Sequence, residues 1–210
     1  MTLHRLTSAE QARTATRSLL LDNDERQQVF RVCLDALAHP GTIRSLGITR
    51  HPAAHLPMLA LTDLMTPVAA LGTEPVDAIT TIAGLTRAPI TEPTAARWVL
   101  TGPDPDPAAL RTLPTGTAAD PHLGAMVCIP VADLAGPEGL PLTLAGPGIP
   151  ETRTLTVDGL TAPVVAARAE LNSAYPRGVD LLLITPDGRL AGLPRTTVIT
   201  VNSGIEGDAR

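Results

Sequence analysis

Arg195, Thr196 and Thr197 are the residues best placed by the sequence to bind a charged ligand. They lie in the segment 193–197 (LPRTT), where an arginine stands beside two hydroxyl groups at the break after an apolar strand pattern. A guanidinium binds a carboxylate or a phosphate through two parallel hydrogen bonds. The alternative is an internal ion pair with Asp180, which begins the apolar run DLLLIT. We favour the internal pair and keep the ligand site as the alternative.

Gly146 and Gly148 offer a second candidate for anion binding. They belong to the segment 144–149 (LAGPGI), which resembles a glycine-rich phosphate loop. Pro147 between them removes a backbone N–H that such a loop would use. A tight exit from a strand is therefore the favoured interpretation, and phosphate contact is the alternative.

His51 and His55 form an HxxxH pair, which on a helix would place two imidazoles on one face and begin a zinc site. Further ligands are missing from the surrounding sequence, and Pro52 and Pro57 interrupt a long helix. A surface segment near a helix start is the better interpretation, so we predict no metal site. No G-x-S-x-G or cysteine-histidine arrangement supports hydrolase chemistry either.

The chain contains no lysine, since all 16 positive side chains are arginines. A Schiff-base enzyme and a Walker A loop both need that amine, so neither chemistry is available and we expect no cofactor and no catalytic residues. The net charge of -5 and an aromatic set limited to Phe30, Trp98 and Tyr175 argue against nucleic-acid binding. Cys33 and Cys128 lie in apolar patterns and are expected to be buried free thiols.

The elements that must position these residues follow from periodicity. Asp22 is suited to cap a helix whose apolar positions are Val29, Phe30, Cys33, Leu34 and Leu37, with a stop at Pro40-Gly41. Further helices are predicted through Leu56–Leu61, over 76–85 and over 162–175, and a short strand over 66–71. The remaining strand patterns are ARWVLTG, GAMVCIPV, LPLTLAG, TRTLTVDG, VDLLLIT, RLAGLP and TVITV.

Continuous apolar runs such as MVCIPV and VDLLLIT are typical of strands covered on both faces, which predicts an α/β fold. The length of 210 residues suits one domain over residues 21–202, preceded by a flexible N-terminal arm (1–20) and followed by a disordered tail (203–210). The N-terminus has no apolar core of signal-peptide length, and no run of about 18 apolar residues occurs, so we expect a cytoplasmic protein without membrane contact.

Taken in order, several segments resemble one family, the H subunit of the bacterial carbon-phosphorus lyase core complex (PhnH). The matching segments are Phe30-Arg31, 38–41 (AHPG), 60–63 (ALTD), 66–68 (TPV), 116–117, 124–125, 142–149 (LTLAGPGI), 175–180 (YPRGVD) and 193–197 (LPRTT). Each is weak alone, and their order and spacing make the set specific. The last three carry most of the weight.

The resemblance implies a three-layer α/β sandwich around a mixed sheet, similar to the large domain of pyridoxal-phosphate-dependent transferases but without the cofactor. It implies partnership with the G, I and J subunits and the L protein, and a homodimer when isolated. In that pathway the I subunit, with G, H and L, joins a phosphonate to the ribose of ATP, and J later cleaves the carbon-phosphorus bond. The segments that match the family add His39 and Asp63 to the candidate ligand-binding residues.

This chain departs from the family pattern at a few positions. Val32, Leu64 and Met65 stand where the family often has charged residues, and Arg177 stands where leucine is common. Three hypotheses follow: an accessory subunit of the phosphonate-degrading assembly with no independent activity, a protein that positions a phosphorylated intermediate through Arg195, Thr196 and Thr197, and a stand-alone pyridoxal-type transferase. The lack of lysine opposes the third.

Overall fold

A computed structural model describes residues 19–48 and 50–202. The predicted arm (1–20), apart from Leu19 and Leu20, and the predicted tail (203–210) lie outside the described residues. The division of the chain into an arm, one domain and a tail stays a prediction.

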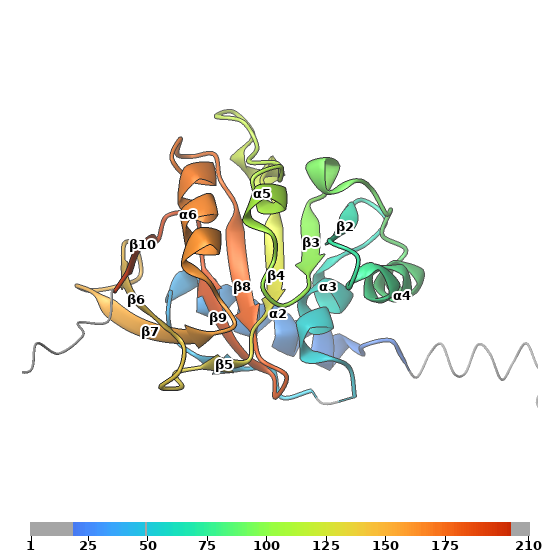
Figure 1. The fold of residues 1–210 in the computed structure, drawn as a ribbon. Coiled ribbons are helices and arrows are strands. Elements are labelled where there is room, and N and C mark those ends of the chain that lie inside the picture. The colour runs from blue at the N-terminus through green and yellow to red at the C-terminus, as the bar shows by residue number, and fades with distance from the viewer. Residues whose placement is uncertain (1–18, 49, 203–210) are drawn as a thin grey trace, which may run out of the picture.

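The protein is built on a six-stranded mixed sheet (Figure 1). The strand order is β1-β9-β8-β4-β3-β2, with bounds β1 (Arg44–Ser45), β2 (Val68–Leu71), β3 (Trp98–Thr101), β4 (Met126–Pro130), β8 (Asp180–Ile184) and β9 (Arg189–Leu193). Strands β2, β3, β4 and β8 run parallel, whereas β9 returns antiparallel to β8. The parallel strands therefore share one carboxyl edge and one amino edge.

A second sheet of four antiparallel strands lies at the left of Figure 1, in the order β10-β6-β7-β5. Its strands are β5 (Asp133–Leu134), β6 (Leu140–Ala145), β7 (Arg153–Asp158) and β10 (Val198–Val201). The sequence patterns predicted β6, β7 and β10 as strands but did not anticipate a separate sheet, because periodicity carries no information on pairing partners.

Helices cover both faces of the large sheet (Figure 1). One face packs against α2 (Asn23–Ala38), α3 (Leu56–Leu61) and α4 (Val76–Thr86), and the other against α5 (Pro107–Leu110), α6 (Ala162–Leu171) and the second sheet. Short 3-10 turns complete the set: η1 (Ala53–His55), η2 (Pro93–Ala95) and η3 (Pro121–Leu123). Along β8, Leu181 and Leu183 face one core and Leu182 and Ile184 the other, which explains the continuous apolar run.

Helix α2 begins at the predicted cap and buries only part of its apolar stripe. Asp22 caps α2 through a reciprocal capping box with Glu25. Of the apolar positions named from the sequence, Val29 and Cys33 are buried, together with Ala36, whereas Phe30 and Leu34 are 48% and 55% exposed. The small Ala36 is buried because β9 approaches the helix backbone at this point: a Cβ on Gly192 would lie 2.7 Å from the carbonyl oxygen of Ala36.

Candidate functional site

The segment 193–197 forms the corner between β9 and β10 at the amino edge of the large sheet. There the Asp180 carboxylate accepts hydrogen bonds from the backbone N–H of Arg195 (2.6 Å), from its Nε (3.2 Å) and from its Nη2 (2.6 Å). The two side chains are only 14% and 17% exposed. The favoured interpretation, an internal ion pair, is confirmed.

Arg195 also holds two other segments. Its Nη1 donates to the carbonyl oxygens of Pro121 (2.7 Å) and Pro176 (3.3 Å), which tie η3 and the turn before β8 to the corner. These bonds leave one N–H of Nη2 without a partner among the described residues. A hollow of about 280 Å³ lies outside this group, lined by residues that include His122, Tyr175 and Thr196.

Thr197 does not face that hollow. Its side chain is 2% exposed, and its hydroxyl oxygen is buried without a hydrogen-bond partner in the described chain. Its backbone N–H donates to Pro194 O (2.8 Å), which closes the corner as a turn. Of the predicted trio, Arg195 and Thr196 reach the hollow and Thr197 belongs to the core.

Arg168, on α6, is a buried residue that supports this corner and that sequence reasoning missed. It is 2% exposed, and its guanidinium donates to the carbonyl oxygens of Pro194 (2.6 Å), Thr197 (3.1 Å) and Leu193 (3.3 Å). Burial lowers the pKa of Arg168 to about 10, against the opposing effect of the Asp180 charge. An arginine on the apolar side of the pattern APVVAARAEL was the available signal.

The two loop glycines serve close packing. Gly146 (φ +136°) lies against Thr196, since a Cβ there would be 2.7 Å from the Thr196 carbonyl oxygen. Gly148 (φ +82°) lies against the end of α2, where a Cβ would be 2.1 Å from the carbonyl oxygen of Ala38. Both positions favour glycine on conformational and steric grounds, which agrees with a tight exit from β6.

His39 and Asp63 lie on two different segments. His39 follows α2, is exposed, and approaches Asp35 with its Nδ1 2.9 Å from the carboxylate. Asp63 follows α3 and accepts from the Met65 backbone N–H (2.9 Å) and the Thr66 hydroxyl (2.8 Å), bonds that lower the pKa of its carboxyl. No recorded hydrogen bond or ion pair among residues 19–48 and 50–202 joins either of them to the Arg195 corner. A ligand role for these two residues stays a prediction.

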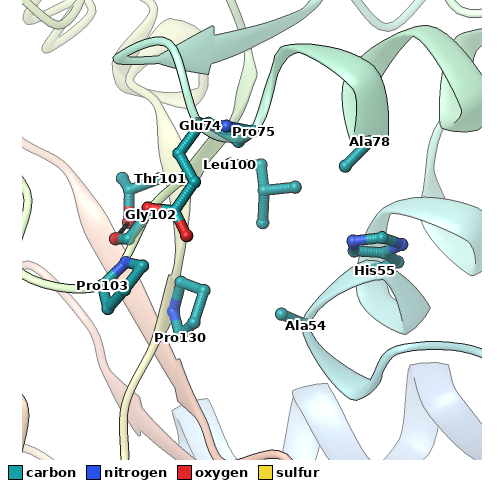
Figure 2. Close-up of a pocket in the computed structure, with 10 residues that line it drawn as sticks. All are labelled: Ala54, His55, Glu74, Pro75, Ala78, Leu100, Thr101, Gly102, Pro103 and Pro130. Atoms are coloured by element: carbon teal, nitrogen blue, oxygen red, sulfur yellow. Dashed lines mark hydrogen bonds between the residues drawn. The ribbon is translucent and has the colours of Figure 1, made fainter.

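A cleft that the sequence did not reveal opens at the carboxyl edge of the parallel strands. We define the carboxyl-edge cleft as a hollow of about 200 Å³ lined by Ala54, His55, Glu74, Pro75, Ala78, Leu100, Thr101, Gly102, Pro103 and Pro130. Figure 2 shows His55 on one side of the hollow and the Glu74 carboxylate, beside Gly102, on the other. Adjoining hollows of about 530 and 280 Å³ share His55 with it.

The polar side chains of this cleft include hydrogen-bond acceptors. Burial lowers the pKa of the His55 imidazole, and the charge of His51 lowers it further. The Thr101 hydroxyl donates to Gly102 O (2.7 Å) and keeps its own lone pairs as acceptors. The carboxylate of Glu74 makes no hydrogen bond or ion pair to any residue that the structure describes. Arg50, in the adjoining hollow, is paired with Glu25.

The HxxxH pair lies beside this cleft without forming a metal centre. His51 precedes η1 and His55 ends it, and the Nε2 of His51 is buried without a partner from the described part of the chain. No group of three or more His, Cys, Asp or Glu side chains suited to a metal ion occurs among the described residues.

The positions that depart from the family pattern lie mainly on the surface. Leu64 and Met65 are 68% and 86% exposed, Val32 is half-buried on α2, and Arg177 lines a hollow of about 370 Å³ that also contains the exposed Arg111–Glu170 ion pair. None of the described helices is long and apolar enough to cross a membrane.

Comparison with known proteins identifies a family and a relative. Residues 20–200 match the family model described as a bacterial phosphonate metabolism protein (PhnH). A stretch of 81 residues is 40% identical to HtxG of Stutzerimonas stutzeri, which is named as a C-P lyase subunit protein. That stretch covers 39% of this chain and 40% of HtxG, so the match spans well under half of either protein.

Proposed function

Because this chain belongs to the PhnH family of bacterial phosphonate metabolism proteins, we propose that it works as a non-catalytic subunit of a carbon-phosphorus lyase assembly. The match of the family model over residues 20–200 carries this proposal, and the similarity to HtxG supports it. The proposed partners are the G, I and J subunits and the L protein. The proposed role is to support formation of ribose 1-phosphonate 5-triphosphate from ATP and an alkylphosphonate.

Two structural observations agree with an accessory role. The guanidinium of Arg195 is engaged mainly by Asp180 and by backbone carbonyls, so its first task is to hold the corner together. Phe30 and Leu34 form part of the exposed face of α2, where apolar side chains are available to a partner protein. Both observations favour an architectural subunit over an enzyme with its own active site.

The second candidate function is positioning of a phosphorylated intermediate at the Arg195 corner. The observation that favours it is the hollow of about 280 Å³ lined by Arg195, Thr196 and His122, together with the N–H of Arg195 that has no described partner. One free N–H and a hydroxyl suffice for a weak oxyanion contact. This candidate is compatible with the first, since a subunit of an assembly can also contact its ligand.

The test is growth and co-purification in the native host. We expect a deletion strain to lose growth on methylphosphonate as the phosphorus source and to keep growth on inorganic phosphate. A tagged copy that restores growth should co-purify with the G, I and J subunits. Normal growth of the deletion strain on methylphosphonate would refute the proposed function.

A further inference from the structure

We propose that the carboxyl-edge cleft binds a small organic ammonium group, held by the Glu74 carboxylate with the His55 imidazole across the hollow. This proposal does not rest on the function proposed above. It is carried by the position of the cleft, by the hydrogen-bonding character of its lining and by the fit of Glu74 against Gly102.

The position is the carboxyl edge of the parallel strands, where the loops that follow several strands meet. The cleft lies outside the carboxyl ends of β3 and β4, and the loop after β2 contributes Glu74. Concave sites lined mainly by apolar side chains with a few polar groups are typical of small-molecule binding. The Arg195 corner is at the opposite, amino edge, so the two sites are separate.

The side chains that line the cleft favour a cation that carries several N–H donors. Glu74 provides an exposed carboxylate, and across the hollow His55 provides a neutral imidazole with an acceptor nitrogen. An ammonium carries a positive charge and N–H donors, which suit both of these groups. None of the residues that line the cleft carries a cation at neutral pH, and an anion would be repelled by Glu74.

The absence of a side chain at Gly102 leaves room for the Glu74 carboxylate at the edge of the cleft. A Cβ at position 102 would lie 2.4 Å from the Oε2 of Glu74, so any larger residue would displace the carboxylate. Gly102 does not require a left-handed conformation, and its neighbour is the far end of a flexible side chain. Gly102→Ala should therefore leave the fold intact and move only the carboxylate.

The apolar walls limit the size of the ligand. Leu100, Pro103 and Pro130 surround the polar groups, and the hollow of about 200 Å³ is smaller than the pockets that hold drug-sized molecules. A short alkyl chain bearing one amine fits this combination. The suitable probe is n-propylammonium, with 1-propanol as the neutral analogue and propionate as the anionic one.

The experiment is an NMR titration of the full-length protein labelled with ¹⁵N, at constant ionic strength and pH 7.5. We expect n-propylammonium to shift the amide signals of Thr101, Gly102 and Ala78 in a saturable way. Propanol should bind about tenfold more weakly, because the charge-assisted bond to Glu74 is lost, and propionate should give no saturable shift.

Three variants decide the outcome. Glu74→Gln and Gly102→Ala should each weaken n-propylammonium binding about tenfold. Glu92→Gln, which removes an exposed carboxylate beside the amino edge, should leave binding unchanged. Any of three results would overturn the proposal. They are propionate binding as tightly as the amine, unchanged amine binding by the Glu74→Gln variant, and an equal loss of amine binding in the Glu92→Gln variant. Because the purified protein is tested alone, failure here leaves the growth test unaffected.

Discussion

At the scale of single residues, Arg195 combines an ion pair with backbone contacts in a mostly buried place. Arg195→Ala would leave the Asp180 carboxylate uncompensated and would free two carbonyl oxygens. We expect it to lower the free energy of unfolding by about 3 kcal/mol, measured by chemical denaturation. Arg111→Ala, which removes an exposed pair with Glu170, is the matched control and should leave the free energy of unfolding nearly unchanged.

The same Arg195→Ala strain separates the two candidate functions. A structural role would be supported if the variant is less stable and growth on methylphosphonate falls in proportion to the amount of folded protein. Intact stability with lost growth would instead identify a ligand contact. If both stability and growth were unchanged, neither role could be maintained for the segment 193–197.

The two histidines near the cleft predict sensitivity to acid. Burial lowers the pKa of His55 and of His51 in the folded protein, so the unfolded chain binds protons first as the pH falls. Stability should be unaffected above the ordinary imidazole range and should fall as the pH drops through about 6.5 toward the lower folded values. Denaturation midpoints measured between pH 8 and pH 5 should decline less in a His51→Asn, His55→Asn double variant. An equal decline in both proteins would exclude these histidines as the cause.

At the scale of elements, the contact between α2 and β9 depends on one glycine. A Cβ at Gly192 would lie 2.7 Å from backbone atoms of Ala36, so Gly192→Ala must push the helix away from the sheet. We expect a loss of about 2 kcal/mol in the free energy of unfolding. Gly84→Ala in α4, where nothing lies within 4 Å of the new Cβ, should raise it by about 0.5 to 1 kcal/mol. The thermal unfolding midpoints of the two variants should shift in opposite directions. A Gly192→Ala variant as stable as the unaltered protein would contradict the close approach of β9 to α2.

At the scale of the whole molecule, exposed apolar side chains favour self-association. Phe30 and Leu34 on α2 are 48% and 55% exposed, and Leu64 and Met65 project from the loop after α3. We expect the isolated protein to be a homodimer at micromolar concentration, and light scattering measures this directly. Phe30→Ser combined with Leu34→Ser should shift the equilibrium toward the monomer if α2 contributes to the contact. A monomer in the unaltered protein would refute the prediction.

The sequence by itself determined the longer helices and strands, because capping and periodicity act over a few neighbouring residues, whereas α5, β1 and β5 were not predicted. The cap at Asp22 and the buried strand DLLLIT were readable in this way, while Pro57 lies in the first turn of α3 and does not interrupt it. It also indicated the pair between Arg195 and Asp180, because two adjacent strand patterns joined by a PDG turn bring their outer ends together. The order of weak motifs indicated the family.

Only the tertiary structure decided which surfaces meet. The apolar stripe of α2 is wider than the face that β9 can approach, so the close contact at Gly192 buries Ala36 and leaves Phe30 and Leu34 exposed. The carboxyl-edge cleft joins His55, Glu74 and Thr101 from three separate segments, and Arg168 reaches carbonyl oxygens more than 20 residues away in the chain. Such contacts depend on the pairing and layering of distant elements, and periodicity within one segment carries no information about its partners.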